Sequence, residues 1–189
     1  MAMPASPAPI TTIEELLALP KDTLCHELLD GLHVVTPAPE YPHQALLGAL
    51  AFAIRRQLEG NPTCELLSSP ADIILGPHTL VQPDLFVIRK SPQQTIRRWS
   101  DVGVPVLAVE FLSASTAARD RGTKRRIYQR AGVAEYWIVD LDARLVERWR
   151  PEDVRPEILS AELTWKAPDA ARITLDLPRL FESVLGPDR

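Results

Sequence analysis

Two carboxylates interrupt segments of the chain that are otherwise apolar. Asp84 lies in LVQPDLFVI (80–88), and Glu110 lies in VPVLAVEFL (104–112). Both segments are rich in the β-branched and aliphatic residues that are typical of strands. Because these strands are apolar on both faces, we expect both acids to be at least partly buried. An unpaired buried carboxylate is costly, so each must be protonated, paired with a base or bound to a metal.

The position of the two acids on consecutive strands favours one of these solutions. For either acid alone, a structural role (an internal salt bridge or a strand end that faces water) explains the residue as well as a functional site does. Adjacent carboxylates repel each other, however, and a divalent cation removes that repulsion. Hard oxygen ligands with no Cys or His cluster nearby suit Mg²⁺ or Mn²⁺ better than zinc. We therefore predict a site for Mg²⁺ (or Mn²⁺) at Asp84 and Glu110.

Composition limits the classes of protein to which this chain can belong. Its 189 residues are enough for one domain with a substantial core, and its net charge of −4 argues against a strongly basic nucleic-acid coat protein. Cys25 and Cys64 form no CxxC pair, so we predict free thiols and a cytoplasmic location. No apolar run is long enough to span a membrane, and we expect no membrane partner. We predict a disordered leader over residues 1–10, which lacks the pattern of a signal peptide, and a single domain over 11–186.

Hydrophobic periodicity predicts the order of helices and strands. From residue 43 to 140 the order is helix, strand, strand, strand, helix, strand. We predict these elements at 43–60, 64–75, 80–88, 104–112, 116–132 and 134–140. The second has a kink at Pro70, and the third starts again after Pro83. A short helix capped by Thr12 and Glu15 and a strand at 32–35 precede them, and further strands and a last helix at 178–185 follow. This order predicts an α/β fold with a mixed sheet, in which an antiparallel meander leads into one right-handed crossover.

Several motifs stand in a familiar order. They are PD at 83–84, VEFLSAST at 109–116, a helix with D…K…Y, and EYWIVD at 135–140. Together they resemble the Uma family of restriction-endonuclease-like proteins, within the PD-(D/E)XK nuclease superfamily. ELLDG (27–31), His43 and PADIIL (70–75) extend the resemblance, which spans roughly residues 12 to 182. It implies a restriction-endonuclease-like αβββαβ core with extra N-terminal and C-terminal elements.

The resemblance also implies where the catalytic amine lies. In the superfamily a lysine follows the last acid by two residues, but here that position holds Leu112. The usual substitute is a lysine from the following helix, which would be Lys124. Asp120, Lys124 and Tyr128 are spaced four residues apart and would form one stripe of that helix. Because an amine is not a metal ligand, we expect removal of Lys124 to leave folding nearly intact.

The remaining site residues complete this hypothesis. Asp84, Glu110 and the backbone carbonyl of Phe111 are predicted to hold Mg²⁺, and Asp72 is a candidate outer ligand. Glu27 is a candidate second acid of the catalytic group, with a role in a turn as the alternative. His43, just before the long helix, is interpreted as a structural contact rather than a ligand.

A basic segment follows the second acid. Residues 119–130 contain six bases and one acid, a local net charge of +5. Such a segment is often only a solvated face, but here it would lie beside the metal site, where a phosphodiester backbone must bind. We predict nucleic-acid contacts from Arg121, Arg125, Arg126 and Tyr128, although Tyr128 is equally suited to packing.

Taken together, these features predict a metal-dependent endonuclease that acts on nucleic acid, with DNA as the favoured substrate and a homodimer as one assembly it would allow. The main alternative is a non-catalytic nucleic-acid-binding or interaction protein on a nuclease fold, because fold does not imply function. A third is a scaffold in which Asp84 and Glu110 pair with arginines. Metal titration separates the scaffold from the enzyme, since the scaffold should ignore Mg²⁺.

Overall fold

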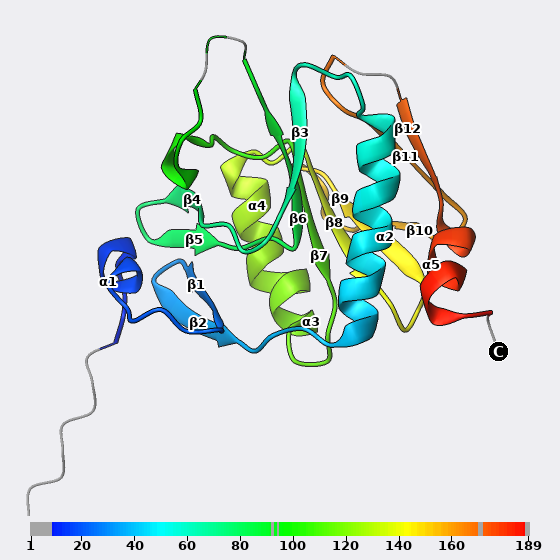
Figure 1. The fold of residues 1–189 in the computed structure, drawn as a ribbon. Coiled ribbons are helices and arrows are strands. Elements are labelled where there is room, and N and C mark those ends of the chain that lie inside the picture. The colour runs from blue at the N-terminus through cyan, green and yellow to red at the C-terminus, as the bar shows by residue number, and fades with distance from the viewer. Residues whose placement is uncertain (1–8, 92, 94, 170–171, 188–189) are drawn as a thin grey trace, which may run out of the picture.

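The computed structural model describes residues 9–91, 93, 95–169 and 172–187. Its centre is a six-stranded sheet with the strand order β10-β9-β8-β7-β6-β3 (Figure 1). Neighbouring strands are antiparallel except β7 and β8, which are parallel. The bounds are β3 (Cys64–Ser68), β6 (Leu85–Arg89), β7 (Leu107–Phe111), β8 (Glu135–Asp140), β9 (Leu145–Trp149) and β10 (Glu157–Leu159). The predicted mixed sheet, with its meander and one parallel crossover, is confirmed.

Helices cover both faces of this sheet, because side chains alternate along each strand. On one face, Leu46 and Leu50 of α2 (Tyr41–Gln57) pack with Val87 and Val109, and α5 (Leu177–Leu185) joins the same cluster. On the other face, α4 (Arg125–Ala131) packs against alternate strand residues such as Ala108. Figure 1 shows α2 and α4 on opposite sides of β6 and β7. Glu110 follows Ala108 by two residues and therefore faces α4.

Two smaller sheets flank the central one. The first has the order β2-β1-β5-β4, and α1 packs on it through Ile13 and Leu16. Its elements are α1 (Ile13–Leu17), β1 (Cys25–Leu29), β2 (Leu32–Thr36), β4 (Ile73–Gly76) and β5 (Thr79–Val81). The predicted capping box of Thr12 and Glu15 is present at α1. The second sheet pairs β11 (Glu162–Lys166) with β12 (Arg172–Asp176), and its apolar residues join the core beneath α2 and α5.

Two predicted strands are wrong in extent. The segments 64–75 and 80–88 are each divided between two sheets: β3 and β6 belong to the central sheet, whereas β4 and β5 form a separate hairpin. Pro70 and Pro83 lie at the two divisions. Because proline lacks the N–H that a ladder needs, the chain leaves one sheet there and enters the other.

The predicted helix 116–132 is present but is not uniform. It consists of α3 (Ala117–Arg119), η2 (Asp120–Lys124) with wider, π-type turns, and α4, which ends at Gly132 with φ 81°. Wider, π-type turns inside a helix often occur at functional sites. Asp120, Lys124 and Tyr128 are all buried on its inner face.

The sequence analysis does not predict β1, which carries Glu27, but the later strands and the last helix agree with the predictions in outline. A short helical turn, η1 (Trp99–Asp101), lies in the loop before β7. Of the predicted disordered leader, only residues 9 and 10 fall within the described part of the chain. Among the helices that the structure describes, none combines the length and the apolar composition that a membrane span requires.

Candidate active site

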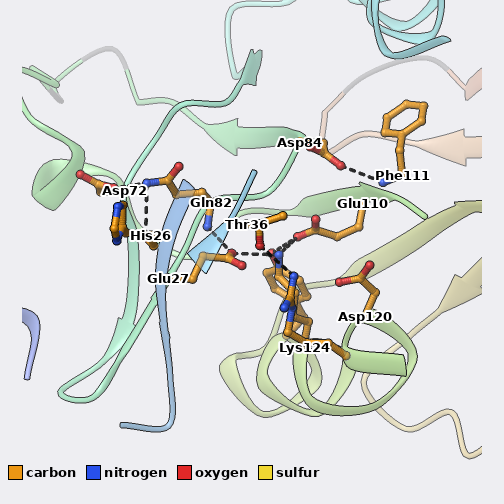
Figure 2. A network of polar contacts seen from close by, with 12 residues as sticks. His26, Glu27, Thr36, Asp72, Gln82, Asp84, Glu110, Phe111, Asp120 and Lys124 are labelled. Carbon is orange, nitrogen blue, oxygen red and sulfur yellow. Dashed lines mark hydrogen bonds and ion pairs between the residues drawn. The ribbon is translucent and has the colours of Figure 1, made fainter. Parts of the chain in front are cut away.

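Lys124 lies at the centre of a buried group of charges. Its Nζ is 2.6 Å from Oε1 of Glu110 and 2.8 Å from Oε1 of Glu27. The exposed fractions are 3% for Lys124, 5% for Glu110 and 2% for Glu27. The three residues come from η2, β7 and β1, so the fold brings together parts of the chain that are far apart in sequence (Figure 2).

The group carries more negative than positive charge. Asp120 is also buried, so three carboxylates lie around one ammonium when all four are ionised. Burial raises the pKa of Glu110 well above its ordinary value, with Lys124 opposing the shift and Asp84 adding to it. Burial by itself would lower the pKa of Lys124, but the charges of Glu110 and Glu27 outweigh it and raise that pKa. The ammonium therefore stays charged, and the surplus negative charge of the group is offset either by a proton on a carboxylate or by a further cation.

Tyr128 positions Glu110 from the same side. Its hydroxyl donates a hydrogen bond of 2.8 Å to Oε1 of Glu110, the oxygen that also contacts Lys124. Tyr128 has no exposed surface, so its predicted contact with nucleic acid is wrong for this conformation. The packing alternative is the correct one, and the hydroxyl holds a carboxylate in place.

Asp84 lies just before β6 and is held from the opposite face of the sheet. Its Oδ2 accepts a hydrogen bond of 2.8 Å from the backbone N–H of Phe111, and Nε2 of His43 in α2 lies 3.2 Å from the same oxygen. His43 was interpreted as a structural contact, and the structure adds that the contact is with a site carboxylate. The sequence gives only a weak indication of this role, because His43 is a single histidine at the start of a helix, after a proline-rich loop.

Asp72 lies at the outer end of a second chain of contacts. Gln82 donates its backbone N–H to Oε1 of Glu27 at 2.8 Å and its side-chain amide to Oδ1 of Asp72 at 2.8 Å. Figure 2 shows Asp72 on the far side of Gln82 from Glu110. The segments 64–75 and 80–88 pair with each other in two separate halves, β3 with β6 and β4 with β5. Asp72 precedes β4 and contacts Gln82. Asp72 thus supports Gln82 and Glu27 and does not join the other carboxylates.

The basic segment is less available than its charge suggests. Arg121 forms ion pairs of 2.6 Å with Glu147 and 2.8 Å with Asp140. The guanidinium of Arg125 lies 4.8 Å from the centre of the Trp149 ring. Arg126 is exposed, and its Nη2 lies 3.5 Å from the Thr123 hydroxyl. Arg121 and Arg126 are both exposed, but of these two only Arg126 forms no ion pair with a described residue.

Comparison with known families agrees with this architecture. The model of the Uma2 family, described as "Putative restriction endonuclease", matches residues 13–179. The chain belongs to the Uma2 family. A search of curated proteins found no match. The solved structures similar to this Uma2 chain include "a putative nuclease belonging to DUF820 from Anabaena variabilis", with a TM-score of 0.77 and 19% identity over 92% of this chain and 98% of the other. At that identity the likeness shows the fold, which is restriction-endonuclease-like, as predicted.

Proposed function

We propose that this Uma2 protein is a nuclease that depends on a divalent metal and hydrolyses phosphodiester bonds, with DNA as its substrate. The family supports nuclease activity in general. One observation carries the finer proposal: Lys124 lies between Glu27 and Glu110, while Asp84 lies at the end of the neighbouring strand. A buried group with surplus negative charge is costly unless it serves a site that binds cations.

Asp84 and Glu110 fit a magnesium site that has few protein ligands. Among the described residues, no group of three or more His, Cys, Asp or Glu side chains could hold a metal, so a cage of the zinc type is not available. Mg²⁺ keeps several waters and often needs only one or two carboxylates together with substrate phosphate. Asp84 and Glu110 offer two, and Asp84 lies close enough to raise the pKa of Glu110. The N–H and C=O of a strand residue point to the same side, so the Phe111 carbonyl faces Asp84 and remains the proposed third ligand.

In this proposal each side chain has a distinct task. Asp84 and Glu110 hold the cation, which supplies Lewis acidity and an acidified water when bound. Lys124 offsets negative charge on the phosphorus centre in the transition state, in place of the lysine that Leu112 replaces. Glu27 holds Lys124 through the 2.8 Å ion pair, and Tyr128 holds Glu110 through its hydroxyl. Arg126, exposed on α4, is proposed to contact the phosphate backbone.

The two alternatives receive less support. In the scaffold alternative, Asp84 and Glu110 pair with arginines, but their contacts are with His43, Phe111, Lys124 and Tyr128. A binding protein without turnover gains nothing from buried acids beside a phosphate. The free thiols of Cys25 and Cys64 support the proposed cytoplasmic location. The single domain over 11–186 and the homodimer stay predictions.

A cleavage assay tests the proposal. Purified protein is incubated with supercoiled plasmid, single-stranded DNA and RNA, with Mg²⁺, with Mn²⁺ or with chelator. We expect DNA cleavage with metal only, and its loss in Asp84→Asn and Glu110→Gln. Glu162→Gln, which changes an exposed carboxylate on β11, is the matched control and should cleave like the wild type. Cleavage that persists in chelator or in Asp84→Asn would refute the site, and metal-dependent DNA binding without cleavage would favour the binding protein.

A further inference from the structure

The two carboxylates of the proposed metal site are held in different ways. Glu110 is contacted from the α4 side of the sheet by Lys124 and Tyr128. Asp84 is contacted from the α2 side by His43. The role of Lys124 and Tyr128 is accounted for above, but nothing so far requires a histidine at the start of α2.

Both contacts of Asp84 are made to one of its two oxygens. The Phe111 N–H and His43 Nε2 lie 2.8 Å and 3.2 Å from Oδ2. Two donors on one oxygen fix the rotation of the carboxylate, which leaves Oδ1 for another partner. Asp84 itself remains partly exposed, at 20% of its side chain, so Oδ1 is the oxygen that a ligand from solvent would use.

The surroundings of Nδ1 indicate which nitrogen of the His43 ring carries the proton. Nδ1 is buried and has no hydrogen-bond partner among the described residues. If Nδ1 carried the proton, a buried N–H donor would have no acceptor, which is costly. If Nδ1 is unprotonated, a buried acceptor lacks a donor, which costs less. We therefore place the ring proton on Nε2, which lies 3.2 Å from Oδ2 of Asp84. The ring also packs against Phe111, with centroids 5.3 Å apart and an angle of 49°, so its orientation is fixed.

We propose that His43 is a positioning residue that orients Asp84 for metal binding: its Nε2–H holds Oδ2 so that Oδ1 presents its lone pairs to a divalent cation. The inference rests on the proposed metal site and assigns to that site a residue from the opposite face of the sheet. Groups that hydrogen-bond a ligating carboxylate have this effect in metalloproteins, and their loss commonly weakens metal binding by about 10–100-fold.

Calorimetric titration with Mn²⁺ tests this without any nuclease assay. His43→Leu keeps the bulk but loses the donor, and it should weaken Mn²⁺ binding by about tenfold or more. His43→Gln places an amide donor near the position of Nε2 and should keep most of the affinity. His78→Leu is the matched control, because His78, in the turn between β4 and β5, contacts the carbonyl of Thr11, which precedes α1. It should bind Mn²⁺ like the wild type.

The outcomes separate this inference from the proposed function. If the wild type binds Mn²⁺ and Asp84→Asn does not, the metal site stands. In that case an unchanged affinity in His43→Leu, or an equal loss in His43→Gln and His43→Leu, overturns the role of His43 alone. A wild type that binds no Mn²⁺ overturns both. The melting temperature without metal is measured in parallel, because a purely structural role would lower it in His43→Leu without changing the affinity.

A second measurement does not depend on the variants folding. NMR of isotope-labelled histidines in the full-length wild type reports which ring nitrogen carries the proton. We expect His43 to carry it on Nε2 in the metal-free protein. A His43 ring with its proton on Nδ1 could not donate to Asp84 and would overturn the proposal.

Discussion

The ammonium of Lys124 lies 2.6 Å from Oε1 of Glu110, and both side chains are buried. A second carboxylate, that of Glu27, contacts the same ammonium at 2.8 Å. This arrangement changes what removal of Lys124 should do. The expectation from sequence was that folding would be nearly intact, but a lysine that balances buried carboxylates is also part of the fold.

Lys124→Met should therefore destabilise the protein. Removing one partner of a buried ion pair leaves uncompensated charge and costs about 3–5 kcal/mol. Lys90→Met is the matched control, because Lys90 pairs with Glu65 at the surface, and it should change stability by less than about 1 kcal/mol. Urea unfolding at neutral pH measures both. Equal losses in the two variants would show that Lys124 is not needed to balance the buried acids.

Glu110 should make the stability of the metal-free protein depend on pH. Burial raises its pKa in the folded state well above 4.5, so the folded protein holds this proton more tightly than the unfolded chain does. The contribution of Glu110 is fully present below about pH 4.5 and declines as pH rises toward the folded-state pKa. Glu110→Gln does not titrate and should lack this decline. Urea unfolding across that pH range, with chelator present, compares the two, and equal slopes would contradict the raised pKa.

Arg126, which is exposed and forms no ion pair with a described residue, should dominate the electrostatic contact with DNA. Arg126 has an exposed head, whereas Arg121 is already paired with Glu147 and Asp140. Arg126→Gln should lower the slope of log affinity against log salt by about one, as expected for one lost phosphate contact. Arg121→Gln should leave that slope nearly unchanged. Fluorescence anisotropy with a short duplex at several salt concentrations measures both. An equal effect of the two variants would mean that the ion pairs of Arg121 open on binding.

Part of this site could be predicted from the sequence, because the residues concerned follow short-range patterns along the chain. Asp84 and Glu110 each interrupt an apolar strand, and Lys124 and Tyr128 share the spacing of one helix face, so short-range patterns reveal them. The fold class follows from the order of these patterns. Proline marks where the strands end, yet the sequence does not say that the chain crosses to another sheet at Pro70 and Pro83.

The rest depends on contacts between distant segments. His43 reaches Asp84 only because the start of α2 packs over the end of β7, and no spacing relates the two residues. The basic segment has a net charge of +5 in the sequence, but the acids that neutralise Arg121 come from β8 and β9. Asp72 is a candidate outer ligand from the sequence, but in the fold it contacts Gln82 in the part of the chain where β4 pairs with β5. Each of these features depends on which segments pack together, which local patterns do not encode.

Cys25 offers a chemical probe of the same group of charges. Burial, and to a lesser extent the charge of Glu27, raises the pKa of its thiol from 9.0 to about 12, with Lys124 partly opposing both. Because the thiolate is the reactive form, alkylation of Cys25 should remain slow where an ordinary cysteine reacts readily. The rate should still be rising at the highest pH at which the protein stays folded.

The variant that tests this electrostatic cause is Glu27→Gln. It removes a negative charge and leaves Lys124 to act on Cys25 with less opposition, so the rate of alkylation at a fixed alkaline pH should rise. Iodoacetamide labelling in a Cys64→Ser background, followed over time by mass spectrometry, measures that rate. Glu65→Gln, at the surface of β3, is the control and should leave the rate unchanged. An unchanged rate in Glu27→Gln would mean that burial alone sets the pKa of Cys25, and that the charge of Glu27 is already fully compensated by Lys124.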